Sequence, residues 1–178
     1  MKKGIMKGFS KGYDAYKDVE NDPSSRLLYI KMNPTTKTGG FMSKSEVDHS
    51  ITANLAIYNV EKNELTYFFD PKEQKQISTF FYETEYHEEN KRMYFNASIN
   101  TCNNKEIAKR DCADKLFVCT ENPEGNAFEF WKSSKNGSNK ELLKSFNDQV
   151  SWSVDPLNKK IIFIEQLPNE VKVEAFDW

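Results

Sequence analysis

Residues 150–178 limit the fold more than any other stretch of the chain. Three runs rich in apolar residues are separated there by two turn-forming segments. The runs are Val150–Val154, Lys159–Gln166 and Val171–Trp178, and the turns are Asp155–Asn158 and Leu167–Asn169. Apolar and polar side chains alternate in the first and last runs, which is typical of half-buried antiparallel strands because successive side chains point to opposite faces. The segment therefore predicts a three-stranded antiparallel meander.

Similar runs recur along the chain and are predicted as strands at 26–32, 51–60, 65–69, 77–86, 92–98, 115–120, 126–133 and 141–146. We therefore predict an all-β protein, an antiparallel meander of hairpins that forms a sandwich, an irregular barrel or a propeller-like set of sheets. The stretch Val150–Ile164 resembles the inner strand pair of a β-propeller blade. The only helices expected are a short one at the N-terminus and one near residues 106–113.

Three predicted hairpin turns share one feature. Asn63, Asn90 and Asn158 each stand just before a charged residue and a new strand. Asparagine tolerates the left-handed backbone conformation that closes a type I turn with a bulge. We therefore predict that conformation in these turns, and we attribute the recurrence to turn chemistry and not to a sequence repeat.

The chain has 178 residues, about the length of one domain. Its first residues differ from the rest, because Gly4, Gly8 and Gly12 recur at every fourth position among lysines and aromatic residues. We predict a leader or an amphipathic segment over residues 1–25 and a single antiparallel β domain over residues 26–178.

The charge balance limits the kinds of partner. The formal net charge is −2 and the isoelectric point is near 5.8, whereas a general nucleic-acid binder needs a basic stripe to neutralise phosphates. The longest apolar runs, such as Ile161–Ile164, are too short to span a bilayer. We expect neither a nucleic-acid partner nor a transmembrane segment.

The N-terminus and the cysteines bear on the compartment. Lysines interrupt the first residues every few positions, so no apolar run of a secretory signal follows the start. Cys102, Cys112 and Cys119 are odd in number, which favours reduced thiols. We predict a cytoplasmic protein. The alternative is an exported protein whose signal has been removed, in which one disulfide and one free thiol would be compatible with the cysteine count.

The only candidate metal or acid–base residues lie on the predicted strand 77–86 and its end. Period-two spacing places Glu83, Glu85 and His87 on one face, although a solvated polar edge explains the pattern more simply. Nine residues lie between Cys102 and Cys112 and six between Cys112 and Cys119, whereas zinc ligands usually come in close pairs. We predict no cofactor and no metal site beyond these three candidates.

No pattern in the sequence identifies a catalytic residue. The two histidines are His49 and His87, and the neighbouring Asp48 and Ser50 do not form a triad with His49, because adjacent side chains in extended chain point apart. The chain also lacks a Gly-x-Ser-x-Gly elbow and a phosphate-binding glycine loop. The enzyme question stays open at this point, with non-catalytic binding favoured.

The sequence therefore favours a non-catalytic binding module that contacts another protein through sheet edges and the polar loop Thr35–Ser50. The last strand is expected at a sheet edge, where Lys172 and Glu174 would discourage aggregation. Two alternatives remain: a carboxylate-dependent hydrolase that acts on carbohydrate, and a small β-barrel that carries an apolar ligand. The oligomeric state is left open.

Overall fold

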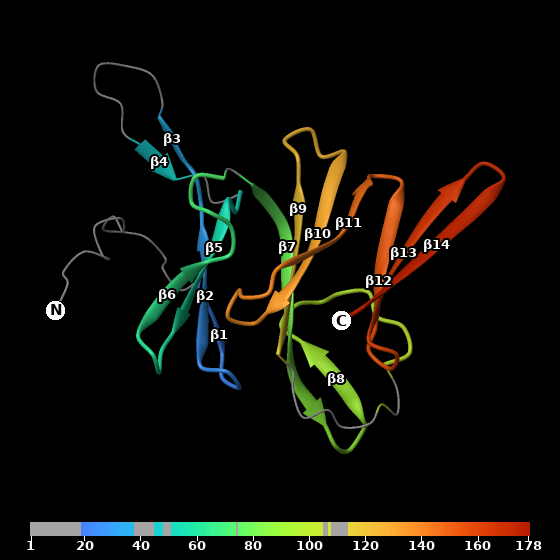
Figure 1. The fold of residues 1–178 in the computed structure, drawn as a ribbon, viewed down its shortest axis with the longest axis horizontal. Coiled ribbons are helices and arrows are strands. Elements are labelled where there is room, and N and C mark those ends of the chain that lie inside the picture. Colours follow the sequence, from blue (N-terminus) through green and yellow to red (C-terminus); the bar gives the residue numbers. More distant parts are fainter. Residues whose placement is uncertain (1–18, 38–44, 48–50, 74, 105–106, 108–113) are drawn as a thin grey trace.

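The computed structural model describes residues 19–37, 45–47, 51–73, 75–104, 107 and 114–178. Every regular element in these residues is a β-strand, and all pairings between named strands are antiparallel (Figure 1). The predicted all-β class is therefore confirmed. The two predicted helices, at the N-terminus and near residues 106–113, fall outside the described residues except for Ile107. No described segment forms a helix long and apolar enough to cross a membrane.

The strands form three sheets and one short ribbon (Figure 1). Sheet 1 has the order β1 (Val19–Asp22), β2 (Leu27–Met32), β5 (Asn54–Asn59) and β6 (Glu64–Tyr67). Sheet 2 has the order β11 (Glu141–Asn147), β10 (Ala127–Ser134), β9 (Lys115–Glu121), β7 (Gln76–His87) and β8 (Arg92–Phe95). Sheet 3 has the order β12 (Val150–Asp155), β13 (Lys160–Leu167) and β14 (Glu170–Asp177). Sheet 3 is the predicted meander, which is confirmed.

The predicted loop Thr35–Ser50 contains regular structure. Strands β3 (Thr35–Lys37) and β4 (Ser45–Val47) pair antiparallel, with Thr35 opposite Val47. Figure 1 shows this ribbon projecting beyond the end of sheet 1. At the start of the chain, β1 pairs with β2 over Val19–Asp22, so the predicted boundary near residue 25 falls inside the β1–β2 hairpin.

Sheet 2 lies between the other two sheets (Figure 1), and β9 shows why. Leu116 and Val118 pack into a buried cluster with sheet 1 residues, whereas Phe117 and Cys119 pack into a second cluster with sheet 3 residues. A strand buried on both faces needs a continuous apolar run instead of alternation. The layers are therefore sheet 1, sheet 2 and sheet 3 in that order, and the described strands do not close into a barrel.

The two clusters differ in composition. The first joins sheets 1 and 2 and consists of Leu27, Tyr29, Leu55, Ile57, Phe68, Phe69, Ile77, Phe80, Tyr82, Leu116 and Val118. The second joins sheets 2 and 3 and consists of Phe81, Phe117, Cys119, Phe130, Leu143, Val154, Ile161 and Phe163. Aromatic rings dominate the second cluster: Trp152 stacks on Phe81 at 5.6 Å between centroids and meets Phe130 edge-on at 4.9 Å. Trp152 is thus a half-buried residue that packs against this cluster.

The turns adopt left-handed conformations, although not always at the asparagines. Asn63 has a φ of 54° as predicted, but in the other two turns the positive φ belongs to the following residue, Lys91 or Lys159. In the last of these turns, Asn158 donates from its backbone N and from its side chain to Asp155, at 3.0 and 2.8 Å. The asparagine is committed to this Asx-type turn, so the next residue takes the left-handed position.

Candidate functional site

The predicted metal or acid–base face is only partly assembled. A bulge shifts the β7–β8 register between Glu83 and Tyr86, so period-two alternation does not continue across it. Glu83 is buried, whereas His87 Nε2 lies 2.7 Å from Glu85 Oε1 at the exposed end of the hairpin. The described residues contain no group of three His, Cys, Asp or Glu side chains placed to hold a metal ion. A role for the three residues in metal binding or acid–base chemistry stays a prediction.

The cysteines that the structure describes are unpaired thiols, with Cys119 buried in the second cluster and Cys102 half-buried. Burial raises the pKa of the Cys119 thiol to about 11, despite a contact with Ser78 that lowers it. With that pKa, the Cys119 thiol is protonated at neutral pH. It is unreactive there because the thiolate is the reactive form. Cys112 lies outside the described residues.

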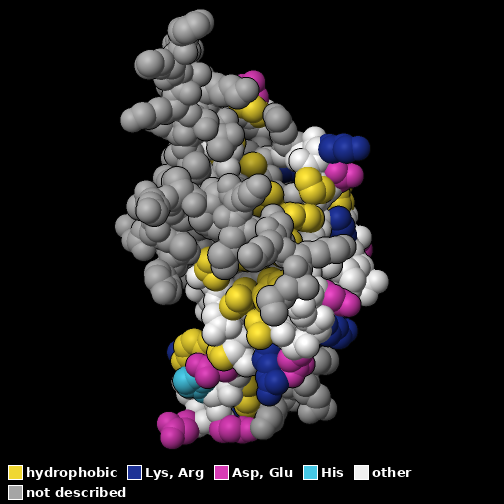
Figure 2. Space-filling view, turned by 90° about the vertical axis from the view of Figure 1, so that its left-hand side faces the viewer, with side chains coloured by type: hydrophobic (Ala, Val, Ile, Leu, Met, Phe, Trp, Pro, Cys, Tyr) yellow, Lys and Arg dark blue, Asp and Glu magenta, His cyan; other side chains and the backbone are white. Residues whose placement is uncertain are grey.

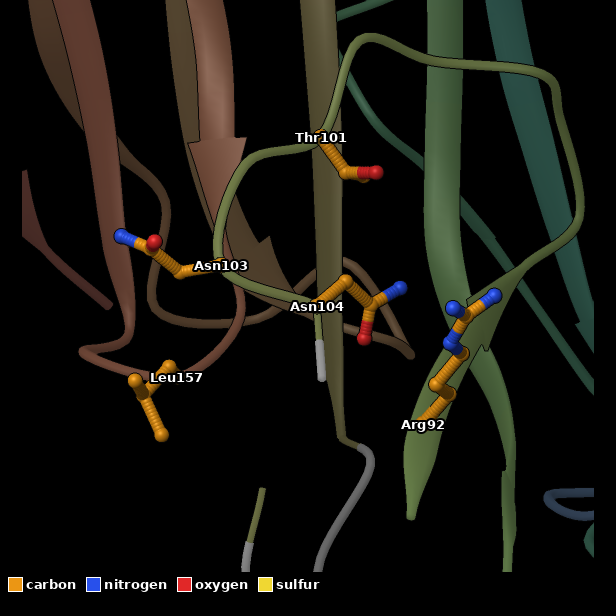
Figure 3. A pocket seen from close by; sticks show the side chains of 5 residues that line it. All are labelled: Arg92, Thr101, Asn103, Asn104 and Leu157. Atoms are coloured by element: carbon orange, nitrogen blue, oxygen red, sulfur yellow. The ribbon is translucent and has the colours of Figure 1, made fainter. Parts of the chain in front are cut away.

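One pocket of about 520 Å³ opens between β8, the segment that follows it, and the β12–β13 turn (Figure 3). Its described lining residues are Arg92, Thr101, Asn103, Asn104 and Leu157. In Figure 3, Asn104 extends toward the strand that carries Arg92, while Asn103 points to the opposite side. The segment is held there because Val154 N donates to Asn100 O and Cys102 N donates to Val154 O, which adds it in parallel to the outer edge of β12.

The polar groups of this pocket are largely committed to the fold. Asn103 Nδ2 donates to Asp155 Oδ2 at 2.9 Å, and Asn104 exchanges hydrogen bonds with the backbone of Met93 at 2.8 and 3.1 Å. Arg92 is the only charged residue among the described lining residues. General acid–base catalysis needs an acid or base facing the reacting atoms, and this lining offers none. The described lining is polar, but it contains no catalytic pair.

Among the described residues, the large apolar side chains with the highest exposed fractions belong to β14. Val171 and Val173 are 62% and 60% exposed, and β14 is the last strand of sheet 3, as predicted. Phe176 and Trp178 pack against the second cluster. Because side chains alternate along a strand, Val171 and Val173 face away from that cluster.

The backbone direction follows from a single hydrogen bond. Trp178 N donates to Lys159 O at 3.0 Å. The even-numbered residues of β14 therefore form backbone hydrogen bonds with β13. The odd-numbered residues direct their N–H and C=O groups away from β13. The outward residues are Val171, Val173, Ala175 and Asp177. Lys132 Nζ donates to Asp177 O at 3.1 Å, which agrees with this direction. Val171, Val173 and Ala175 therefore form an edge, called here the free edge of β14.

The apolar side chains of β14 continue across sheet 3. Register places Val173 opposite Ile164 and Ala175 opposite Ile162, on the face that points away from the second cluster. Both isoleucines are only half-buried. We call this surface the outer face of sheet 3; its members are Ile162, Ile164, Val171, Val173 and Ala175.

The predicted protective charges, Lys172 and Glu174, lie on this edge strand and are exposed. Lys172 and Glu174 share their side of β14 with Phe176, and Glu174 Oε1 accepts from Lys144 Nζ at 2.7 Å. Lys172 and Glu174 are thus on the side of sheet 2, whereas the valines point to solvent, on the same side of β14 as Asp177. The sequence signal for this orientation of β14 is that Phe176 and Trp178, which pack toward sheet 2, are spaced by even numbers of residues from Lys172 and Glu174.

The opposite side of the molecule offers a less defined surface. Figure 2 shows basic and acidic side chains interspersed there, with apolar side chains along the middle of the face beside residues outside the described ranges. The pocket residues Arg92, Asn103 and Asn104 were not singled out by the sequence, because they come together from a hairpin and an irregular segment without periodicity.

No known protein family, curated protein or solved structure matches the chain.

Proposed function

We propose that the protein is a non-catalytic binding module that contacts another protein by accepting an added strand at the free edge of β14. The observation that carries the proposal is the pair of exposed valines, Val171 and Val173, on an eight-residue edge strand. An unpaired edge supplies main-chain hydrogen bonds for an incoming strand, and the alternate side chains supply specificity. The β3–β4 ribbon, which projects from sheet 1 (Figure 1), is proposed as a second contact.

The described structure gives less support to the alternatives. A carboxylate-dependent hydrolase needs two facing acids in a cleft, whereas the described lining of the pocket contains one arginine and no carboxylate. An apolar ligand carried inside a small barrel needs a closed barrel, and the described strands form three open sheets.

The proposal is tested by site-specific photo-crosslinking in cells that express the protein. A benzophenone side chain at position 171 is expected to give discrete protein adducts. A matched probe at Val60, which is 50% exposed in the β5–β6 turn, is expected to give none of them. The adducts should disappear when Val173→Pro is added, because proline removes an outward N–H and leaves the bonds to β13 intact.

Thermal unfolding of the Val173→Pro variant checks that sheet 3 is still formed. Adducts that are the same from positions 171 and 60, or that persist in the Val173→Pro background, would show that the free edge does not bind a partner strand.

A further inference from the structure

We propose that the strand added to β14 is β14 of a second copy of this chain, in an antiparallel register centred on Val173. This inference rests on the proposed function and names its partner. Sheet 3 would then continue across a two-fold axis as a single sheet of six strands, and both copies would use the same surface. Such an isologous contact closes on itself and does not propagate into a fibre.

Charge selects the register. With the axis at Val173, Lys172 lies opposite Glu174 of the partner subunit, and symmetry repeats this pair. Opposite charges directly across a strand pair are favourable, whereas like charges are unfavourable. A shift of the axis to Glu174 places Glu174 opposite itself, and a shift to Lys172 places Lys172 opposite itself. Of these three registers, only the one centred on Val173 pairs charges of opposite sign. An axis at Val171 would also pair Lys172 with Glu170, but β14 begins at Glu170, so only three residues of each strand would pair.

The backbone is compatible with the same register. Val171, Val173 and Ala175 direct their N–H and C=O groups outward, and the axis at Val173 aligns each of them with an outward residue of the second copy. Val173 meets Val173 of the partner subunit, and Val171 meets Ala175 of the partner subunit. Narrow hydrogen-bonded pairs then form at each of these positions.

The side chains and the surroundings agree with this arrangement. The exposed valines of both copies would form one apolar stripe on the outer face of sheet 3. In Figure 1, β14 lies at the margin of the molecule, and no labelled strand lies beyond it. Lys132 Nζ already donates a hydrogen bond to Asp177 O. The added strand therefore pairs along the middle of β14 and ends before Asp177.

The test is sedimentation equilibrium of the full chain over a series of concentrations. The wild-type chain is expected to form a dimer, and Val173→Pro is expected to abolish it. Lys172→Glu places two pairs of like charges across the axis and should weaken dimerisation by about tenfold. The quadruple variant Lys144→Glu/Glu165→Lys/Lys172→Glu/Glu174→Lys also reverses the charges within each copy, because Glu165 lies opposite Lys172 in β13 and Lys144 contacts Glu174. It should restore the wild-type dissociation constant.

Each outcome separates the two proposals. A wild-type chain that is monomeric throughout, or a dimer unaffected by both Val173→Pro and Lys172→Glu, overturns pairing with a second copy. If the position 171 adducts then contain a different protein and still require Val173, strand addition stands with another partner. If those adducts are also absent, the proposed function fails together with this inference.

Discussion

The two junctions between the sheets are built in different ways. Sheets 2 and 3 meet through aromatic and aliphatic side chains, with Phe130 edge-on to Phe163 at 5.5 Å between ring centroids. Sheets 1 and 2 also share an apolar cluster, but a buried ion pair crosses beside it. Lys135 Nζ lies 2.6 Å from Asp22 Oδ2, and the two side chains are 5% and 0% exposed.

The turn that carries Lys135 makes close contacts with sheet 1. Lys135 O accepts a hydrogen bond from Tyr29 Oη at 3.0 Å, and the ring of Tyr29 stacks on Tyr82 at 4.6 Å. Gly137 has a φ of +79°, and a Cβ there would lie 2.9 Å from Cδ1 of Ile57. Side chains other than hydrogen would therefore be strained and crowded at this position.

The two junctions differ in how strictly they fix the orientation of one sheet on the other. Burial of aromatic area stabilises whichever packing fills the space, whereas a buried charge is tolerated only when its partners are in place. Asp22 also accepts hydrogen bonds from Ser24 and Ser25. We infer that the ion pair fixes how sheet 1 sits on sheet 2, while the aromatic cluster mainly supplies stabilisation between sheets 2 and 3.

The largest effect is expected from Lys135→Met. The substitution keeps the length of the side chain and leaves the Asp22 carboxylate buried without its cation, so the free energy of unfolding should fall by about 3–5 kcal/mol. Urea denaturation, followed by tryptophan fluorescence, measures the change.

The control is the double variant Asp22→Asn/Lys135→Met, which removes both charges. It should recover a large part of the lost stability, because neither charge is then left unpaired. Equal stability of the single and the double variant would contradict the view that the unpaired carboxylate is responsible.

The sequence predicts the strands of this fold better than the junctions between its sheets. Alternation in 150–178 identifies sheet 3, and the unbroken apolar run Leu116–Cys119 is explained by burial on both faces of β9. The ion pair could not be predicted, because Asp22 and Lys135 are 113 positions apart and each stands in a polar turn segment. Their burial is a consequence of how the sheets meet, which no local pattern encodes.

The candidate binding surface was predictable in part. The position of β14 at an edge was predicted from its place as the last strand of the meander. Which of its faces is exposed was not predicted, because valines and charged residues alternate and the shared parity of Phe176 and Trp178 with the charged set was the only local signal. Phe176 and Trp178 decide the matter through their packing against the second cluster.

A smaller effect is expected from acid, through Asp22. Burial alone would raise the pKa of Asp22, but hydrogen bonds from Lys135, Ser25 and Ser24 outweigh it and lower the pKa below the ordinary value. A lowered pKa in the folded state contributes stability at neutral pH, which is lost as the pH falls below about 4 toward the folded-state pKa. The loss should be smaller than that of Lys135→Met, because a protonated Asp22 is neutral and still forms hydrogen bonds.

The measurement is the free energy of unfolding between neutral pH and about pH 3. Asp22→Asn should be less stable than the wild type at neutral pH, since Lys135 loses its counter-charge, and should show a shallower decline in acid. Parallel pH profiles for the two proteins would show that Asp22 does not titrate differently in the folded and unfolded states.

The smallest of these effects is expected in the aromatic junction. Ile161 is fully buried in the second cluster, opposite Phe176, and Ile161→Val removes one methylene without exposing a polar group. The cost should be about 0.5–1.5 kcal/mol, because neighbouring rings can partly relax into the space. Ile164→Val on the half-buried outer face is the matched control and should cost less. If Ile161→Val proved as damaging as Lys135→Met, the second junction would be as intolerant of change as the first, and the contrast between directional and non-directional packing would have to be abandoned.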